Sequence, residues 1–195
     1  MSTTEYLDRE RLVRVAADVA DRDGWLHLTM SNVAEAVDRH VTSLYGHVDG
    51  IHGLRREVQL LALSELADRC WAAVLGRSGE DALVSLLDVY REHTRDHPGR
   101  SAALLDVDLR DPQIRRLGER LAEPFYATLR GFGVPENQLQ ATQAIISVSV
   151  RGFGLSEASG RFGKRAAADA AFAQLRQLFV HALASGDWPV AGRRV

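Results

Sequence analysis

The sequence predicts an all-α protein, and three observations support this fold class. Apolar residues recur three and four positions apart along most of the chain, which is the period of an amphipathic helix. Glycine, proline and aspartate cluster where these patterns stop. No segment alternates apolar and polar residues in the way that is typical of a strand.

The first helix is expected from about Thr4 to Asp23. Its apolar residues, counted from Leu12, fall at i, i+3, i+4, i+7 and i+8 and so form one buried stripe. Gly24 ends the helix, because glycine readily adopts the left-handed conformation that closes one.

Two short helices are expected next. Thr29 is the N-cap of the second helix, whose apolar face includes Met30 and Val37. After a break at Asp38 to His40, a third helix runs from Val41 to Val48. Together the three helices form a compact unit at the start of the chain.

A larger helical region, residues 49–195, follows. Asp49-Gly50 opens a long helix, and His97-Pro98-Gly99 is a strong breaker. Pro124 is expected to kink or end the helix that contains it, because proline lacks a backbone N–H. Helices are expected over about 50–75, 80–96, 110–132, 135–158 and 166–184.

Composition excludes several classes of protein. Of the 195 residues, 46% are hydrophobic and 26% are charged, as in soluble globular proteins. Cys70 is the only cysteine, which excludes an internal disulfide, and no apolar run approaches the roughly 18 residues of a membrane span. With no signal peptide either, we expect a cytoplasmic protein without a membrane partner. The formal charge of -2 gives no overall basic signal, so any nucleic-acid contact depends on a local surface.

The motifs of an enzyme are absent or incomplete. The stretch 152-GFG-154 fails as a dinucleotide-binding fingerprint, because Glu157 stands where the third glycine belongs. The Gly-x-Ser-x-Gly turn of a serine hydrolase is absent. We therefore expect no enzymatic activity and no cofactor.

Histidine pairs suggest only weak metal sites. His93 and His97 are four residues apart and could share a helix face, but Pro98-Gly99 ends that helix and no acidic motif accompanies them. Two exposed polar residues are the simpler interpretation. His40 and His47 are too loosely spaced to bind a metal without further ligands, so no metal site is expected.

The two short helices, separated by three residues, have the spacing of a helix-turn-helix, in which the second helix lies in the major groove of DNA. Leu44 and Val48 would hold that helix on the core. From spacing alone, the solvated face of a small helix is an equally good interpretation. The side chains that would donate to phosphates and base edges are Arg39, His40, Thr42, Ser43, Tyr45 and His47.

The segment 28-LTMSNVAEAVDRHVTSLYGHV-48 resembles the DNA-binding segment of the tetracycline-repressor (TetR) family of bacterial transcription regulators. The leading Leu-Thr, the Val-Ala of the second helix and the Leu-Tyr-x-His of the third all match. The resemblance implies a helix-turn-helix DNA-binding domain, residues 1–48, and a helical effector-binding and dimerisation domain, residues 49–195. It implies a repressor that binds double-stranded operator DNA as a homodimer and is released by a small-molecule effector.

The resemblance also implies roles for individual residues, some of which differ from what the helical period predicts. It places Ser31, Val41, Thr42 and Tyr45 against bases. The period alone places Val41 with the core, so its DNA contact is implied only by the resemblance. Phosphate contacts are implied for Thr29, Ser43 and His47, and His40 is a further candidate.

Three positions depart from the family pattern. Asp38 replaces the turn glycine, Arg39 a small apolar residue, and Ile51 a phosphate-binding lysine. Residues 1–47 hold five Arg and no Lys against eight Asp and Glu, a formal -3. This predicts weak nonspecific DNA affinity, since phosphate neutralisation supplies most of it. Arg55 and Arg56 are expected to replace part of the lost charge; the alternative is a helical ligand-binding or interaction protein with weak or lost DNA affinity.

The larger region contains candidates for an effector site. The stretch 151-RGFGLSEASGRFG-163 resembles a His-Gly-Phe segment of one group of these C-terminal domains, with Arg151 in place of the histidine. Arg151 is expected to pair with an acidic side chain or an anionic effector, and an interface salt bridge is the alternative. Residues that line either a pocket for a largely apolar effector or simply the core are Trp71, Tyr90, Phe125, Tyr126 and Gln143.

Apolar stripes on the last two helices predict a homodimer through a four-helix contact, because they exceed what a small monomer covers. We expect Phe179→Glu to weaken this dimer. The stripe residues are Phe172, Leu175, Phe179, Ala182 and Leu183 on the last helix, and Ile145, Ile146, Val148 and Val150 on the one before.

Overall fold

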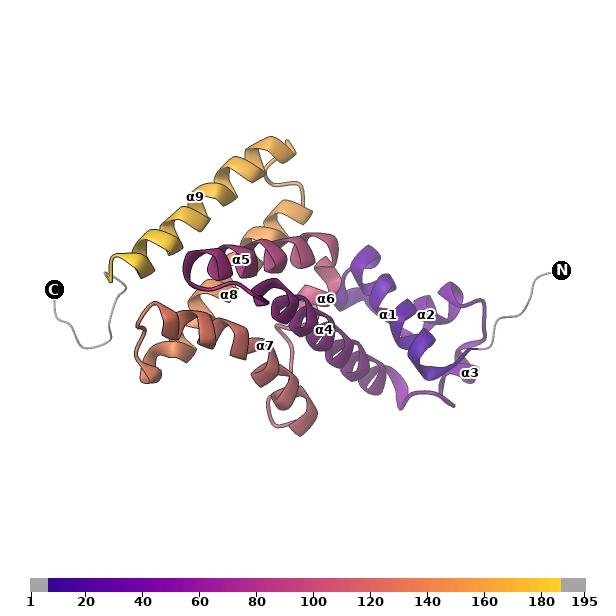
Figure 1. The fold of residues 1–195 in the computed structure, drawn as a ribbon. Coiled ribbons are helices and arrows are strands. Elements are labelled where there is room, and N and C mark those ends of the chain that lie inside the picture. The colour runs from indigo at the N-terminus through magenta and orange to yellow at the C-terminus, as the bar shows by residue number, and fades with distance from the viewer. Residues whose placement is uncertain (1–6, 187–195) are drawn as a thin grey trace. The chain divides into compact units, whose positions relative to one another are not determined.

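The structure, a computed structural model, describes residues 7–186. Within this range every regular element is a helix, which confirms the all-α prediction (Figure 1). None of these helices is long and apolar enough to cross a membrane. The elements are α1 (Arg9–Asp23), the 3-10 helix η1 (Trp25–His27), α2 (Met30–Ala36), α3 (Val41–Leu44), α4 (Gly50–Val74), α5 (Gly79–Asp96), α6 (Pro98–Ala103), α7 (Pro112–Gly131), the 3-10 helix η2 (Glu136–Gln138), α8 (Leu139–Ala158) and α9 (Arg165–Ala184).

The chain divides into two compact units. The N-terminal unit contains the chain up to Glu65 together with His97–Arg115, and the C-terminal unit contains Leu66–Asp96 together with the chain from Arg116 onward. Helices α4 and α7 each contribute residues to both units. The predicted division after residue 48 follows function rather than packing, and it stays a prediction.

Helix α1 supplies much of the core of the N-terminal unit. Asp8 caps it by accepting a hydrogen bond from the backbone N–H of Arg11 at 2.7 Å. The helix therefore begins at Arg9 and not near Thr4; residues 4–6 lie outside the described range.

Fully burying a leucine side chain contributes roughly 1.5–3 kcal/mol. Leucines with no exposed surface in this core are Leu12, Leu28, Leu44 and Leu54.

Helix α6 is not predicted by the sequence, because His97-Pro98-Gly99 indicates a break. Proline is well tolerated at the first helical position, where the missing N–H would have no partner. Gly99 lets α6 approach α1, since a Cβ there would lie 2.0 Å from the carbonyl oxygen of Ala20. Asp21 of α1 accepts a hydrogen bond from the backbone N–H of Arg100 at 2.8 Å. Contacts between distant parts of the chain thus stabilise this short helix.

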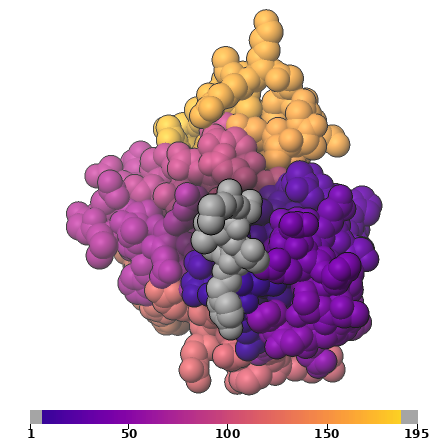
Figure 2. Space-filling view, turned by 90° about the vertical axis from the view of Figure 1, so that its right-hand side faces the viewer, coloured from indigo at the N-terminus to yellow at the C-terminus, as the bar shows by residue number. Residues whose placement is uncertain are grey.

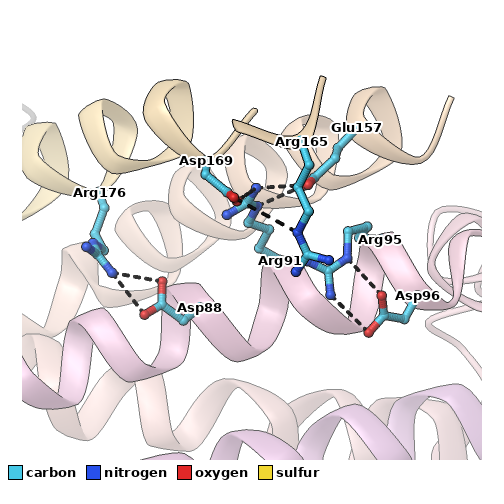
Figure 3. A network of polar contacts seen from close by, with 8 residues as sticks. All are labelled: Asp88, Arg91, Arg95, Asp96, Glu157, Arg165, Asp169 and Arg176. Atoms are coloured by element: carbon cyan, nitrogen blue, oxygen red, sulfur yellow. Dashed lines mark hydrogen bonds and ion pairs between the residues drawn. The ribbon is translucent and has the colours of Figure 1, made fainter. Parts of the chain in front are cut away.

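In the C-terminal unit, α8 and α9 pack against α5 (Figure 1). Gly154 allows the close approach of α8, because a Cβ there would lie 2.8 Å from the side chain of Thr94 on α5. Arg91 of α5 donates to Glu157 of α8 at 2.8 Å and to Asp169 of α9 at 2.7 Å (Figure 3). One buried guanidinium therefore ties the three helices together.

The predicted helix boundaries hold within a few residues, with two differences of substance. Helix α3 ends at Leu44 and not at Val48, because the backbone N–H groups of His47 and Val48 both bond to the Leu44 carbonyl in a turn. Pro124 does not end its helix, since α7 continues past it to Gly131. The expectation of a boundary at this proline is wrong.

Candidate nucleic-acid interface and effector site

The turn between α2 and α3 is formed by Asp38, which has a φ of 52°. Glycine adopts this left-handed conformation freely, and aspartate tolerates it better than most residues. The backbone N–H of Arg39 then bonds to the carbonyl of Ala34 at 3.0 Å. Buried Ala34 and Leu44 hold the two helices on the core, so the helix pair is present with aspartate in place of glycine.

Thr29 begins α2 through a reciprocal cap with Asn32. Its hydroxyl accepts from the Asn32 backbone N–H at 3.2 Å and donates to the Asn32 side-chain oxygen at 3.0 Å. The same oxygen accepts from the Thr29 backbone N–H at 2.9 Å. Both donors of Thr29 are therefore used within the protein, which assigns it a capping role; its phosphate contact stays a prediction.

The other residues that the resemblance assigns to DNA belong to α2, α3 and the residues beside them, a part of the chain that is violet in Figure 2. Tyr45 is 59% exposed, although it is aromatic. Val41 packs against the core and is only half-buried, as the helical period predicts. The exposed members are Ser31, His40, Thr42, Ser43 and Tyr45, and His47 is half-buried like Val41.

Arg55 and Arg56 already have partners within the N-terminal unit, and their replacement of part of the missing charge stays a prediction. Arg55 donates to the carbonyl of Leu28 at 3.1 Å and lies over the Trp25 ring, 5.5 Å from its centre. Arg56 donates to Asp111 at 2.5 Å. The hydrogen bond from Arg56 holds the pKa of Asp111 below its usual value. Both guanidinium groups are occupied inside the N-terminal unit.

Other arginines of this unit are paired as well. Arg9 binds Glu57 at 2.7 Å, and Arg14 binds Glu10 at 2.8 Å. Arg39, next to the turn, makes only a long contact of 3.5 Å to the backbone carbonyl of the residue before it. The local charge available to phosphates is therefore small, which agrees with the formal -3 of the first 47 residues.

Three residues predicted for an effector site meet in the C-terminal unit. Tyr90 of α5 and Phe125 of α7 are each 1% exposed, and their rings stand edge to face at 78° with centres 6.0 Å apart. Arg151 of α8 donates from Nη2 to the Tyr90 hydroxyl. Its guanidinium carbon lies 5.6 Å from the centre of that ring. Burial raises the pKa of Tyr90, while the charge of Arg151 opposes the rise.

The remaining predicted effector residues, Gln143, Trp71 and Tyr126, take no part in the contacts among Tyr90, Phe125 and Arg151. Gln143 donates to the Ser147 hydroxyl at 2.9 Å. Ser147, which the sequence did not single out, stands four residues from both Gln143 and Arg151, and this spacing could have revealed a shared polar face of α8. Trp71 lies at the surface, 37% exposed, and Tyr126 is half-buried.

No group of three or more side chains suited to a metal ion occurs within residues 7–186. His93 is 1% exposed, so its interpretation as an exposed polar residue is wrong. His97 is half-buried, and its Nδ1 lies 3.0 Å from Asp21.

The apolar stripes of α8 and α9 are divided between the protomer core and its surface. Phe172, Phe179 and Leu183 are buried inside the protomer, as are Ile146 and Val150. These five residues therefore pack mainly within the protomer, and the expected effect of Phe179→Glu on a dimer stays a prediction. The large apolar side chains that these two helices expose are Ile145 at 51%, Val148 at 63% and Leu178 at 64%.

Comparison with known proteins agrees with the class that the fold and the helix pair define, a helix-turn-helix transcription regulator. Residues 83–179 match a family described as tetracyclin repressor-like, C-terminal domain. An HTH-type transcriptional regulator of Mycobacterium tuberculosis is 30% identical over 156 residues, which are 79% of this chain and 72% of that protein. The protein belongs to the TetR family of transcriptional regulators. This is a family of regulators and not of enzymes, as predicted.

Solved structures share the fold at low sequence identity. BioQ of Mycobacterium smegmatis is 20% identical with a TM-score of 0.66, covering 92% of this chain and 99% of that one. BioQ with its double-stranded DNA operator gives a TM-score of 0.65. ActR of Streptomyces coelicolor in complex with (S)-DNPA is 16% identical with a TM-score of 0.64, covering 93% and 98% of the two chains.

Proposed function

We propose that this protein is a one-component repressor that binds operator DNA as a homodimer and leaves it when a small molecule binds the C-terminal unit. The observation that carries the proposal is the surface of α2, α3 and the following turn, which we call the reading surface. It is held by the turn at Asp38, and Tyr45 and Thr42 are exposed on it. An exposed aromatic beside hydroxyl groups suits contacts to base edges and methyl groups in the major groove. Such a regulator acts in the cytoplasm, where the DNA is.

The partners follow from relatives and from the exposed surface. BioQ is seen with its operator and ActR with a small molecule, and this chain shares their fold. Ile145, Val148 and Leu178 expose apolar area on the two helices that the family pairs in its dimers. Covering such residues is the main gain of free energy on association.

The proposed effector site contains Tyr90, Phe125 and Arg151, with Gln143 on the same face of α8 as Arg151. An effector releases DNA only if it binds one of two conformations of the dimer better than the other. A hundredfold difference in affinity shifts that equilibrium by about 2.7 kcal/mol. The favoured conformation would space the two reading surfaces so that they no longer fit successive major grooves.

A second candidate function is a helical ligand-binding protein that has lost useful DNA affinity. The occupied Arg55 and Arg56 and the isoleucine at position 51 favour it, because they leave few cations for phosphate. The two functions share the fold and the effector site. They differ only in whether the reading surface binds DNA.

A mobility-shift titration with DNA from upstream of the gene, at two salt concentrations, tests the proposal. We expect a specific complex whose affinity falls about 1–3 kcal/mol in Tyr45→Ala, the usual value of a specifying contact. A Ser78→Ala variant, at an exposed position in the loop before α5, is the matched control and should bind like the parent. Absence of any complex at the lower salt, with the dimer intact, would favour the second function.

A further inference from the structure

The buried and half-buried arginines of the C-terminal unit differ in whether a carboxylate lies beside them. Of these four arginines, three have a carboxylate partner within 4 Å (Figure 3). Arg151 is the fourth, and among the residues that the structure describes it has none. The paired ones are Arg91 with Glu157 and Asp169, Arg95 with Asp96, and Arg176 with Asp88.

Arg91 shows how a guanidinium of this unit meets a carboxylate. Its Nε and Nη2 donate to the two oxygens of Glu157, both at 2.8 Å, in the parallel geometry that makes such pairs strong. Arg151 uses Nη2 for the hydroxyl of Tyr90, and its Nε is buried without a hydrogen-bond partner. The edge of Arg151 formed by Nε and Nη2 therefore bonds to one neutral hydroxyl oxygen, whereas the same edge of Arg91 bonds to two carboxylate oxygens.

Tyr90 does not neutralise Arg151. Burial raises the pKa of the phenol, so its hydroxyl stays protonated at neutral pH and accepts the hydrogen bond as a neutral group. Arg151 is half-buried and its Nε is out of contact with water, and partial loss of hydration without a carboxylate partner costs free energy. No carboxylate of residues 7–186 pairs with Arg151, so a bound ligand is a source of the anion that this part of the chain does not supply.

We infer that the effector of the proposed function is a carboxylic acid whose carboxylate pairs with Arg151. This inference rests on the proposed function and adds the chemical class of its ligand. A single arginine balances one negative charge, which favours a monocarboxylate over a phosphate monoester. Beside Arg151 the surroundings are aromatic and uncharged, with the edge-to-face rings of Tyr90 and Phe125, which suits an acid whose remainder is apolar.

Thermal unfolding of the ligand-free protein provides the first test, with Arg91 as a matched control. Arg91→Met leaves Glu157, whose side chain is 8% exposed, without its counterion and should lower the melting temperature by roughly 6 °C or more. Arg151→Met removes a charge that has no carboxylate partner among the described residues and breaks only the hydrogen bond to Tyr90, so the melting temperature should fall clearly less than in Arg91→Met. An equal loss in both variants would mean that Arg151 already has an anionic partner, such as a carboxylate of a second subunit, and would overturn the inference.

Binding to the free dimer provides the second test. Straight-chain carboxylic acids of four to twelve carbons and 4-phenylbutyrate are titrated beside their primary alcohols. The parent should bind at least one acid roughly tenfold or more tightly than its alcohol, and Arg151→Met should lose this preference. Arg151→Lys keeps the charge without the forked geometry, so this variant should retain part of the preference for the acid over its alcohol. Equal affinity for acids and alcohols, or no binding of any acid, contradicts the inference.

These measurements need no DNA, so their failure is distinct from failure of the proposed regulator. If the protein retards operator DNA but does not bind carboxylates, the proposed function holds and the inferred ligand class is wrong. If the protein binds carboxylates through Arg151 but does not retard DNA, the inferred ligand class holds and the proposed regulatory function is wrong.

Discussion

Trp71 supplies the hydrogen bond that Pro124 cannot make. In an α-helix the N–H of residue 124 would bond to the carbonyl of Arg120, but proline has no N–H. The indole Nε1 of Trp71, on α4, donates to that carbonyl at 3.0 Å. This contact provides a physical reason why α7 continues through the proline, and it gives Trp71 a structural role apart from the predicted effector site.

A double-mutant cycle checks this relationship. Trp71→Phe keeps the ring but removes the donor, and we expect a loss of about 1 kcal/mol in the free energy of unfolding measured with urea. Pro124→Ala restores the backbone N–H, so the same Trp71→Phe change should cost clearly less in that background. Equal losses in both backgrounds would show that the indole N–H is not compensating for the proline.

Neighbouring residues on α9 should separate dimerisation from folding. Leu178 is 64% exposed, so Leu178→Glu should dissociate the proposed dimer and leave the melting temperature of the monomer nearly unchanged. Phe179 is 4% exposed, and Phe179→Glu should reduce the free energy of unfolding by roughly 3–5 kcal/mol, because a cavity and an unpaired charge are created together. Sedimentation velocity and thermal unfolding measure the two effects. A Leu178→Glu protein that stays dimeric would locate the interface elsewhere.

Position 51 should control the electrostatic part of DNA affinity. Ile51 is half-buried against the core at the start of α4, and a lysine can cover the same apolar surface with its methylene stem. Ile51→Lys would add one phosphate contact per protomer, so log affinity against log salt should steepen by about two units per dimer. Ile51→Met is the control without charge, and it should leave the slope as it is. An unchanged slope in both variants means that this position does not face phosphate.

Cys70 should be inert in the folded protein. Burial raises the pKa of its thiol to about 12, and the side chain has no exposed surface. Alkylation by iodoacetamide at pH 8 should therefore be slow until the protein unfolds, since the thiolate is the reactive form. An unfolded thiol ionises near pH 8.5, so this residue's effect on stability is absent below that pH and becomes unfavourable as the pH rises toward 12. Rapid alkylation of the native protein would contradict the burial of this thiol.

The sequence by itself determined the helical fold, and it located the short helices α2 and α3 that carry the proposed reading surface. Helical period, caps and turns depend on neighbours in the chain, so the stripe from Leu12, the cap at Thr29 and the turn at Asp38 are visible before any tertiary contact. The Leu-Tyr-x-His motif is local in the same way. Tyr45 could be placed on the surface for that reason.

Only the tertiary structure decided which partners these helices have. Gly99 suits α6 because Ala20 lies against it, and Arg55 is occupied because it lies beside the carbonyl of Leu28. Periodicity identifies an apolar stripe but cannot say whether another helix or another subunit covers it, and only the structure shows that Phe179 packs within the protomer. Such outcomes depend on residues that are distant in the chain and meet only after folding. The lack of a carboxylate beside Arg151 is another property of this kind, because it depends on the whole set of side chains packed around one residue.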